Sequence, residues 1–129
     1  LVDLDNQDCM DLKRRLAALP DYCDPPPTVR FRIAIEETEA FYLGDRAAIK
    51  RAFPKVKLQK LAAYDQDSVC GTWELFRDTI GESSEDKVEW AKLMGAVLGT
   101  KWKGAGANKS VSFQHFCKAA LFLAGELST

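Results

Sequence analysis

A proline-rich segment at residues 20–27 constrains this chain more than any other feature, because no helix can pass through it. Pro20 is followed by three consecutive prolines that begin at Pro25. Proline fixes the φ angle and lacks the amide hydrogen that a helix interior donates. Before this segment, apolar residues at helical spacing predict an amphipathic helix from Asp3 to Leu19. The sequence therefore predicts an N-terminal helix, a linker over residues 20–27, and the rest of the chain beyond it.

Most of the sequence after the linker is typical of short helices. Asp45 can cap a helix that Pro54 interrupts, and Gly81 is a suitable stop for a later one. Ser83 or Ser84 can cap the helix after that. The last predicted helix is the most apolar, so we expect it at the centre of the core. The expected helices span residues 45–53, 72–80, 85–99 and 111–127.

Two segments could instead be strands. Residues 28–36 alternate and are rich in β-branched and aromatic side chains, which favours a strand. Residues 36–43 fit a helix at least as well, so strand and helix both stay open for residues 28–43. Residues 55–61 alternate again, and a small sheet could pair them with residues 29–35.

Length and charge limit the fold and the partners. With 129 residues, 47% of them hydrophobic, the chain can bury one core, so we expect a single domain over residues 1–129. We expect a mainly α fold, a compact domain of about five helices with a short two-stranded β element; α+β is the alternative. A formal net charge of -1 gives no overall attraction to nucleic acid. The longest apolar stretch, residues 119–124, is far shorter than the roughly 20 residues that cross a bilayer, so we expect no membrane span.

The cysteine pattern bears on metal binding and location. Cys9, Cys23, Cys70 and Cys117 are widely spaced, and no CxxC pair suggests zinc or a redox motif. We expect no metal and no cofactor. Reduced core thiols favour an intracellular, cytoplasmic protein; two disulfides in a secreted protein are the alternative.

The run from Asn108 to Phe116 resembles the exit of an EF-hand loop into its second helix. Val111 would take loop position eight, and the helix over residues 85–99 would be the entering one. Upstream, Asp65 and Asp67 match the first two ligand positions of another such loop.

Neither loop has the ligands that calcium needs, which are several oxygens, a glycine at position six and a glutamate at position twelve. In the second loop, Lys109 replaces the glycine and His115 replaces the glutamate. In the upstream loop, Val69 and Phe76 fall on ligand positions. The resemblance implies a degenerate, calcium-independent EF-hand-like module that serves as a binding surface or structural subunit. The alternative is a common helix-loop-helix arrangement unrelated to EF-hands.

The chemistry of an enzyme is incomplete in this sequence. His115 is the only histidine, and Cys117 lies two residues away, where side chains on one helix do not face each other. Lys109 and Ser110 lack the preceding glycine and strand of a phosphate-binding loop. The acidic run around Glu36 and Glu39 resembles a solvated face. We therefore expect no catalytic residues.

Candidate partner-binding residues are Lys101, Trp102 and Lys103, a basic and aromatic tip in the loop before the last helix. The alternative for Trp102 is that it covers its own core. A basic cluster also spans residues 50–60, where lysines can protect a sheet edge. The function that fits is a non-enzymatic adaptor or structural subunit that binds another protein. A secreted, disulfide-linked ligand-binding or effector protein and a nucleic-acid-binding accessory protein are the alternatives.

Overall fold

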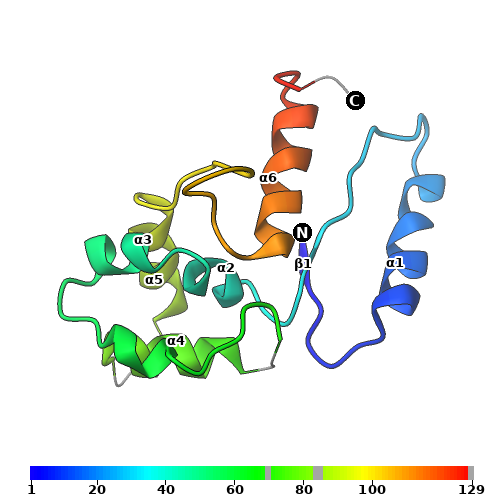
Figure 1. Cartoon of the computed structure of the whole chain (residues 1–129). Coiled ribbons are helices and arrows are strands. Elements are labelled where there is room, and N and C mark those ends of the chain that lie inside the picture. The colour runs from blue at the N-terminus through cyan, green and yellow to red at the C-terminus, as the bar shows by residue number, and fades with distance from the viewer. Residues whose placement is uncertain (69–70, 83–85, 128–129) are drawn as a thin grey trace.

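The computed structural model describes residues 1–68, 71–82 and 86–127, and it confirms a mainly α fold with a short β element (Figure 1). The α-helices of the described residues are α1 Cys9–Ala17, α2 Glu39–Leu43, α3 Arg46–Ala52, α4 Thr72–Ile80, α5 Lys87–Gly95 and α6 Val111–Leu123. Single 3-10 turns are η1 Leu19–Tyr22 and η2 Leu58–Leu61, and the strands are β1 Val2–Asp3 and β2 Ile33–Ala34.

The two-stranded element is present, but its predicted partner was wrong. β2 lies inside the predicted strand and pairs in parallel with β1, with Val2 opposite Ile33. Residues 55–61 do not pair with it; they end in the 3-10 turn η2, and Leu61 is fully buried in the helical core. Residues 28–43, for which the sequence left strand and helix open, form an extended stretch that contains β2 and is followed by α2.

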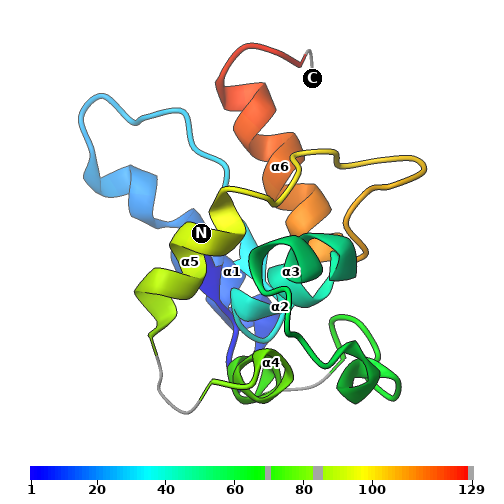
Figure 2. The ribbon, with the colours of Figure 1, turned by 90° about the vertical axis from the view of Figure 1, so that its left-hand side faces the viewer.

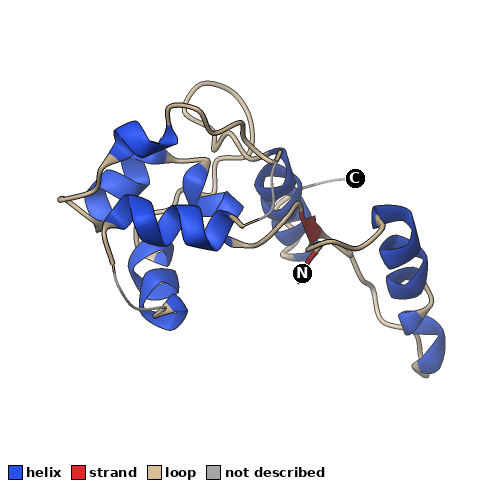
Figure 3. Cartoon of the chain, turned by 90° about the horizontal axis from the view of Figure 1, so that it is seen from below, coloured by secondary structure: helices blue, strands red, loops and turns tan. Residues whose placement is uncertain are grey.

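The N-terminal helix is shorter than predicted at both ends, because Asp3 belongs to β1 and α1 spans only Cys9–Ala17. α1 begins after Asp8, whose carboxylate accepts a 2.8 Å hydrogen bond from the amide of Asp11. β1 and α6 lie between α1 and the group of helices α2 to α5 (Figure 1 and Figure 3).

The main core lies among α2, α3, α4 and α5, which are close together in Figure 2. Phe76 of α4 is fully buried there, and its ring centroid lies 5.2 Å from that of Tyr42 and 5.5 Å from that of Trp90. The expectation that the last helix forms the centre of the core was wrong. α6 instead packs Phe113 and Cys117 against Phe41 in a second, smaller cluster.

Helix ends follow their local capping residues. Asp45 caps α3 through the amide of Ala48, and Gly81 ends α4 with a φ of 82°. α5 is capped by Asp86, which accepts from the amide of Glu89; the predicted caps Ser83 and Ser84 lie outside the described residues. α6 starts at Val111 as predicted and ends earlier, at Leu123.

Candidate functional site

The predicted tip in the loop before α6 combines a core contact with a basic surface. Trp102 is half-buried and packs on the second cluster. The ammonium of Lys103 lies 4.6 Å from the centroid of its ring, and that of Lys118 on α6 lies 5.6 Å away. Lys101 differs, because its ammonium donates to the carbonyl of Ala105 within the same loop. The structure thus brings Trp102 and Lys103 together and adds Lys118.

Two adjoining hollows lie along α6 next to this tip. The first, of about 320 Å³, lies among α1, the extended segment 31–35 and α6. The second, of about 250 Å³, lies between segment 30–32 and the far end of α6. Arg32 and His115 line both hollows, and Lys118, which lines the second, connects it to the Trp102 tip through its contact with the Trp102 ring.

The lysine and arginine side chains that line the hollows have no acidic counterpart among the described residues of the lining. Lys13, Arg30, Arg32 and Lys118 line them, and no Asp or Glu of the described residues does. Nor does any of these four cations form an ion pair with a carboxylate in the described part of the chain. In a chain with 18 basic and 19 acidic residues, this is a local separation of charge.

Both arginines are held in place by the protein itself. The guanidinium of Arg30 lies 4.4 Å from the ring centroid of Phe122, a favourable cation–π arrangement. Arg32 donates from Nε to the carbonyl of His115 at 3.0 Å and from a terminal nitrogen to the carbonyl of Phe31 at 2.7 Å. These contacts order the two cations before any ligand is present.

The walls between the cations are largely apolar. Phe31, Ile33 and Ile35 come from the extended segment, and Phe122 and Leu127 come from the end of α6 and the residues after it. We call the whole surface the α6 basic face. Its residues are Lys13, Arg30, Phe31, Arg32, Ile33, Ile35, Trp102, Lys103, His115, Lys118, Phe122 and Leu127.

Asp67 fixes the position of α6 from a distant loop. One oxygen of its carboxylate accepts from the amides of Val111 and Ser112 at 2.8 and 3.3 Å and from the hydroxyl of Ser110 at 3.2 Å. The first amides of a helix have no partner within the helix, and a negative charge there is favourable. Asp67 therefore stabilises the start of α6.

Asn108 ties the same end of α6 to α2. Its side-chain amide donates to the carbonyl of Phe41 at 2.7 Å, and its oxygen accepts from the amide of Ser110 at 2.8 Å. The amide of Lys109 donates to the carbonyl of Gly44 at 2.9 Å. The start of α6 is thus fixed to the α2–α3 corner.

The acidic run at the start of α2 is not the solvated face that the sequence suggested. Glu36 and Glu39 are only 4% and 7% exposed. Glu37 accepts from the amide of Trp73 and the hydroxyl of Thr72, both at 3.0 Å, and so stabilises the start of α4. Burial raises the pKa of Glu39, whose carboxylate lies 3.7 Å from the ammonium of Lys87. These carboxylates are therefore buried or bound to other parts of the folded chain, and they do not form a solvated face.

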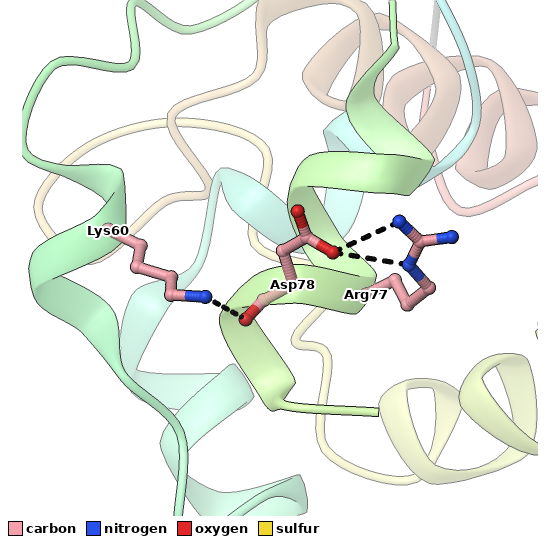
Figure 4. Close-up of polar contacts among 3 residues, drawn as sticks. All are labelled: Lys60, Arg77 and Asp78. Carbon is pink, nitrogen blue, oxygen red and sulfur yellow. Dashed lines mark hydrogen bonds and ion pairs between the residues drawn. The ribbon is translucent and has the colours of Figure 1, made fainter. Parts of the chain in front are cut away.

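Two members of the basic cluster at residues 50–60 donate hydrogen bonds to backbone carbonyls at helix ends. Lys60 donates to the carbonyl of Asp78 at 2.8 Å in the last turn of α4, where Arg77 pairs with the Asp78 carboxylate at 3.1 Å (Figure 4). A cation at a helix C-terminus interacts favourably with its free carbonyls. Arg51 similarly donates to the carbonyl of Val97. These two cations of the cluster therefore have structural roles, while Lys50, Lys55 and Lys57 are exposed.

The structure describes His115 and three of the four cysteines. His115 is exposed and shares the first hollow with Cys9 and Ser112, but its side chain has no hydrogen bond to either. Burial raises the pKa of the Cys117 thiol, which disfavours the nucleophilic thiolate. Cys9, Cys23 and Cys117 are free; Cys70 lies outside the described residues.

The described ranges are residues 1–68, 71–82 and 86–127. There, no group of three or more His, Cys, Asp or Glu side chains is placed to hold a metal ion. No helix in those ranges has the length and apolar character needed to cross a membrane.

Of the residues on the α6 basic face, Trp102 and Lys103 were predicted candidates from the sequence, whereas Lys13, Arg30, Arg32 and Lys118 were not. The alternation around Phe31 was interpreted only as a strand signal. Two arginines in an otherwise apolar segment were the available sign of a surface exposed beside the core.

Comparison of the chain with protein-family models, with curated proteins and with solved structures gave no match.

Proposed function

We propose that this chain is a non-enzymatic protein-interaction domain or structural subunit that binds a partner protein through the α6 basic face. One observation carries the proposal, namely the gathering of ordered arginines, a half-buried tryptophan and apolar hollows on one surface. Arginine and tryptophan are enriched at the energetic centres of protein interfaces. Interfaces combine apolar contact with a polar, charged rim, and the α6 basic face offers both.

The binding is proposed to be independent of calcium. Asp67, one of the two upstream residues that match EF-hand ligand positions, already has its carboxylate engaged with the start of α6. Val111 begins α6, and His115 stands where the resemblance would need a glutamate. Calorimetric titration with calcium is expected to show no saturable binding. Saturable micromolar binding would contradict this part of the proposal.

An intracellular, cytoplasmic location is proposed together with this function. The free state of Cys9, Cys23 and Cys117 supports it, because cytosolic proteins keep their thiols reduced. Thiol titration under denaturing conditions, on protein isolated from the cells that make it, is expected to find all four cysteines reduced. Two disulfides would instead favour the secreted alternative.

The proposal is tested by quantitative affinity capture from the cells that make the protein. The test variant carries Lys103→Glu and Lys118→Glu, both on exposed side chains beside Trp102. The control variant carries Lys50→Glu and Lys55→Glu, an equal charge change on exposed side chains elsewhere. We expect a partner that the wild type and the control retain and the test variant loses. Equal capture by both variants, with both folded, would refute the role of this face.

A further inference from the structure

We infer that the α6 basic face takes an acidic, amphipathic peptide segment of the partner, with its carboxylates on the arginines and lysines and its apolar side chains in the two hollows. This inference rests on the proposed function, because it specifies the chemistry of the partner at the same surface. It is carried by charge complementarity and by the apolar walls of the hollows.

Four cations that line the hollows form no ion pair with a carboxylate of the described chain. Lys13 and Arg32 line the first hollow, and Arg30, Arg32 and Lys118 line the second. A segment with several Asp or Glu residues can contact these cations along its length. Complementary charge of this kind speeds association and excludes wrong partners.

Order within the face favours tight recognition. Arg30 rests on Phe122, and Arg32 is fixed by the carbonyls of Phe31 and His115. A ligand therefore does not have to immobilise these two long side chains, which lowers the entropy cost of binding. Arginine can also bind a carboxylate through two parallel hydrogen bonds.

The apolar walls distinguish a peptide from other anions. A free phosphate would contact the cations and leave Phe31, Ile33 and Leu127 uncovered. The phosphates of a nucleic acid would do the same, because their affinity comes mainly from charge. An amphipathic peptide can place side chains into both hollows and gain from covering apolar surface.

The test uses a random peptide library displayed on phage and selected on the intact folded chain. We expect the selected peptides to be enriched in Asp and Glu and to carry Leu, Ile, Phe or Trp at recurring positions. The enriched peptide is then synthesised with a fluorescent label and titrated by anisotropy. Failure to select any peptide, or selection without acidic enrichment, would overturn the inference.

Variants locate the binding. Lys13→Glu with Arg30→Glu changes two exposed cations and is expected to raise the Kd at least tenfold. Lys50→Glu with Lys55→Glu, with the same change in net charge, is expected to raise it less than threefold. Circular dichroism melts confirm that each variant is folded, and a second variant, Arg30→Gln with Lys118→Gln, replaces the first if it unfolds. Equal weakening by test and control variants would overturn the inference.

Two competitors separate the chemical classes. Hexaglutamate supplies charge without apolar side chains, and a 20-residue oligodeoxythymidylate supplies phosphates. We expect each to compete at least tenfold more weakly than the selected peptide. If hexaglutamate competes equally, the apolar part of the inference is wrong; if the oligonucleotide binds more tightly, the face is a nucleic-acid site. If affinity capture succeeds while no acidic peptide binds, the inference fails and the interaction function stands.

Discussion

Asp67 links two distant parts of the chain at the scale of a single residue. It has a φ of 58°, a left-handed conformation that aspartate and asparagine tolerate better than most residues. Its carboxylate reaches the start of α6 from the loop before α4. The residue therefore contributes both a turn and a helix cap.

Asp67→Asn tests this role while keeping the size of the side chain and its tolerance of positive φ. The change removes the negative charge that stabilises the α6 amides, so we expect the free energy of unfolding to fall by about 1 to 2 kcal/mol. Urea denaturation measures it. Asp65→Asn, on an exposed residue of the same loop, is expected to change stability by less than about 0.5 kcal/mol. Equal losses of unfolding free energy in the two variants would show that the contact of Asp67 with the α6 amides does not stabilise the fold.

Glu39 should make stability depend on pH. Burial raises its pKa above the ordinary value of 4.5, so the folded state takes up this proton before the unfolded state as pH falls. The free energy of unfolding therefore falls as pH rises from about 4.5 through the folded-state pKa of Glu39, because the buried carboxyl group becomes charged. Its ion pair offsets part of this cost, but Lys87 is 46% exposed, and such pairs contribute little.

We expect Glu39→Gln to be at least as stable as the wild type at pH 7 and to lose this advantage below pH 4.5. Denaturant unfolding at a series of pH values measures the difference. A wild type that is clearly more stable than the variant at pH 7 would show that the Lys87 ion pair outweighs burial.

At the scale of elements, the corner between α2 and α3 sets how closely the start of α6 can approach. Gly44 occupies this corner, and a β-carbon built there would lie 1.8 Å from the side-chain oxygen of Asn108 and 2.8 Å from the amide nitrogen of Ser110. Its φ of -72° is ordinary, so space rather than backbone conformation requires the glycine.

Gly44→Ala is therefore expected to lower the free energy of unfolding by about 3 kcal/mol, because a buried polar contact must be displaced. Gly95→Ala is the matched control; nothing lies within 4 Å of its added β-carbon at the end of α5, and alanine favours helix by up to about 1 kcal/mol. Thermal and urea unfolding measure both variants. Similar effects of the two changes would contradict this account of the corner.

Elements with local signals were predictable from the sequence, and those that depend on distant contacts were not. Asp45 and Gly81 mark the ends of α3 and α4 through hydrogen bonds and backbone geometry within a few residues. β1 was not predicted, and its residue Asp3 was assigned to the N-terminal helix, because its partner β2 lies some thirty residues away. Glu37 was interpreted as solvated because the start of α4, which it stabilises, is equally distant.

The candidate site was predictable only in part for the same reason. Trp102 and Lys103 are adjacent in sequence, so their combination was visible. Lys13, Arg30 and Lys118 belong to α1, to the extended segment and to α6. Only the tertiary structure shows that they line a common surface.

At the scale of the whole molecule, α6 lies between helix α1 and the main core formed by α2 to α5 (Figure 1). Its inner side packs Phe113 and Cys117 on the second cluster, while the α6 basic face borders α1 and the extended segment. The chain is nearly neutral, yet it presents a cationic and apolar surface along α6. Hydrogen bonds of Asn108 and Asp67 hold the start of this helix in place. This arrangement is the basis of the proposed interaction.

Site-specific photo-crosslinking in the cells that make the protein tests the interaction most directly. A photo-reactive amino acid replaces Lys118 on the α6 basic face or, as the control, the exposed Lys55. We predict a discrete crosslinked protein from position 118 and none from position 55, and we predict that Lys13→Glu with Arg30→Glu weakens that crosslink. No crosslink from position 118, or the same product from both positions, would contradict a partner-binding role for this face.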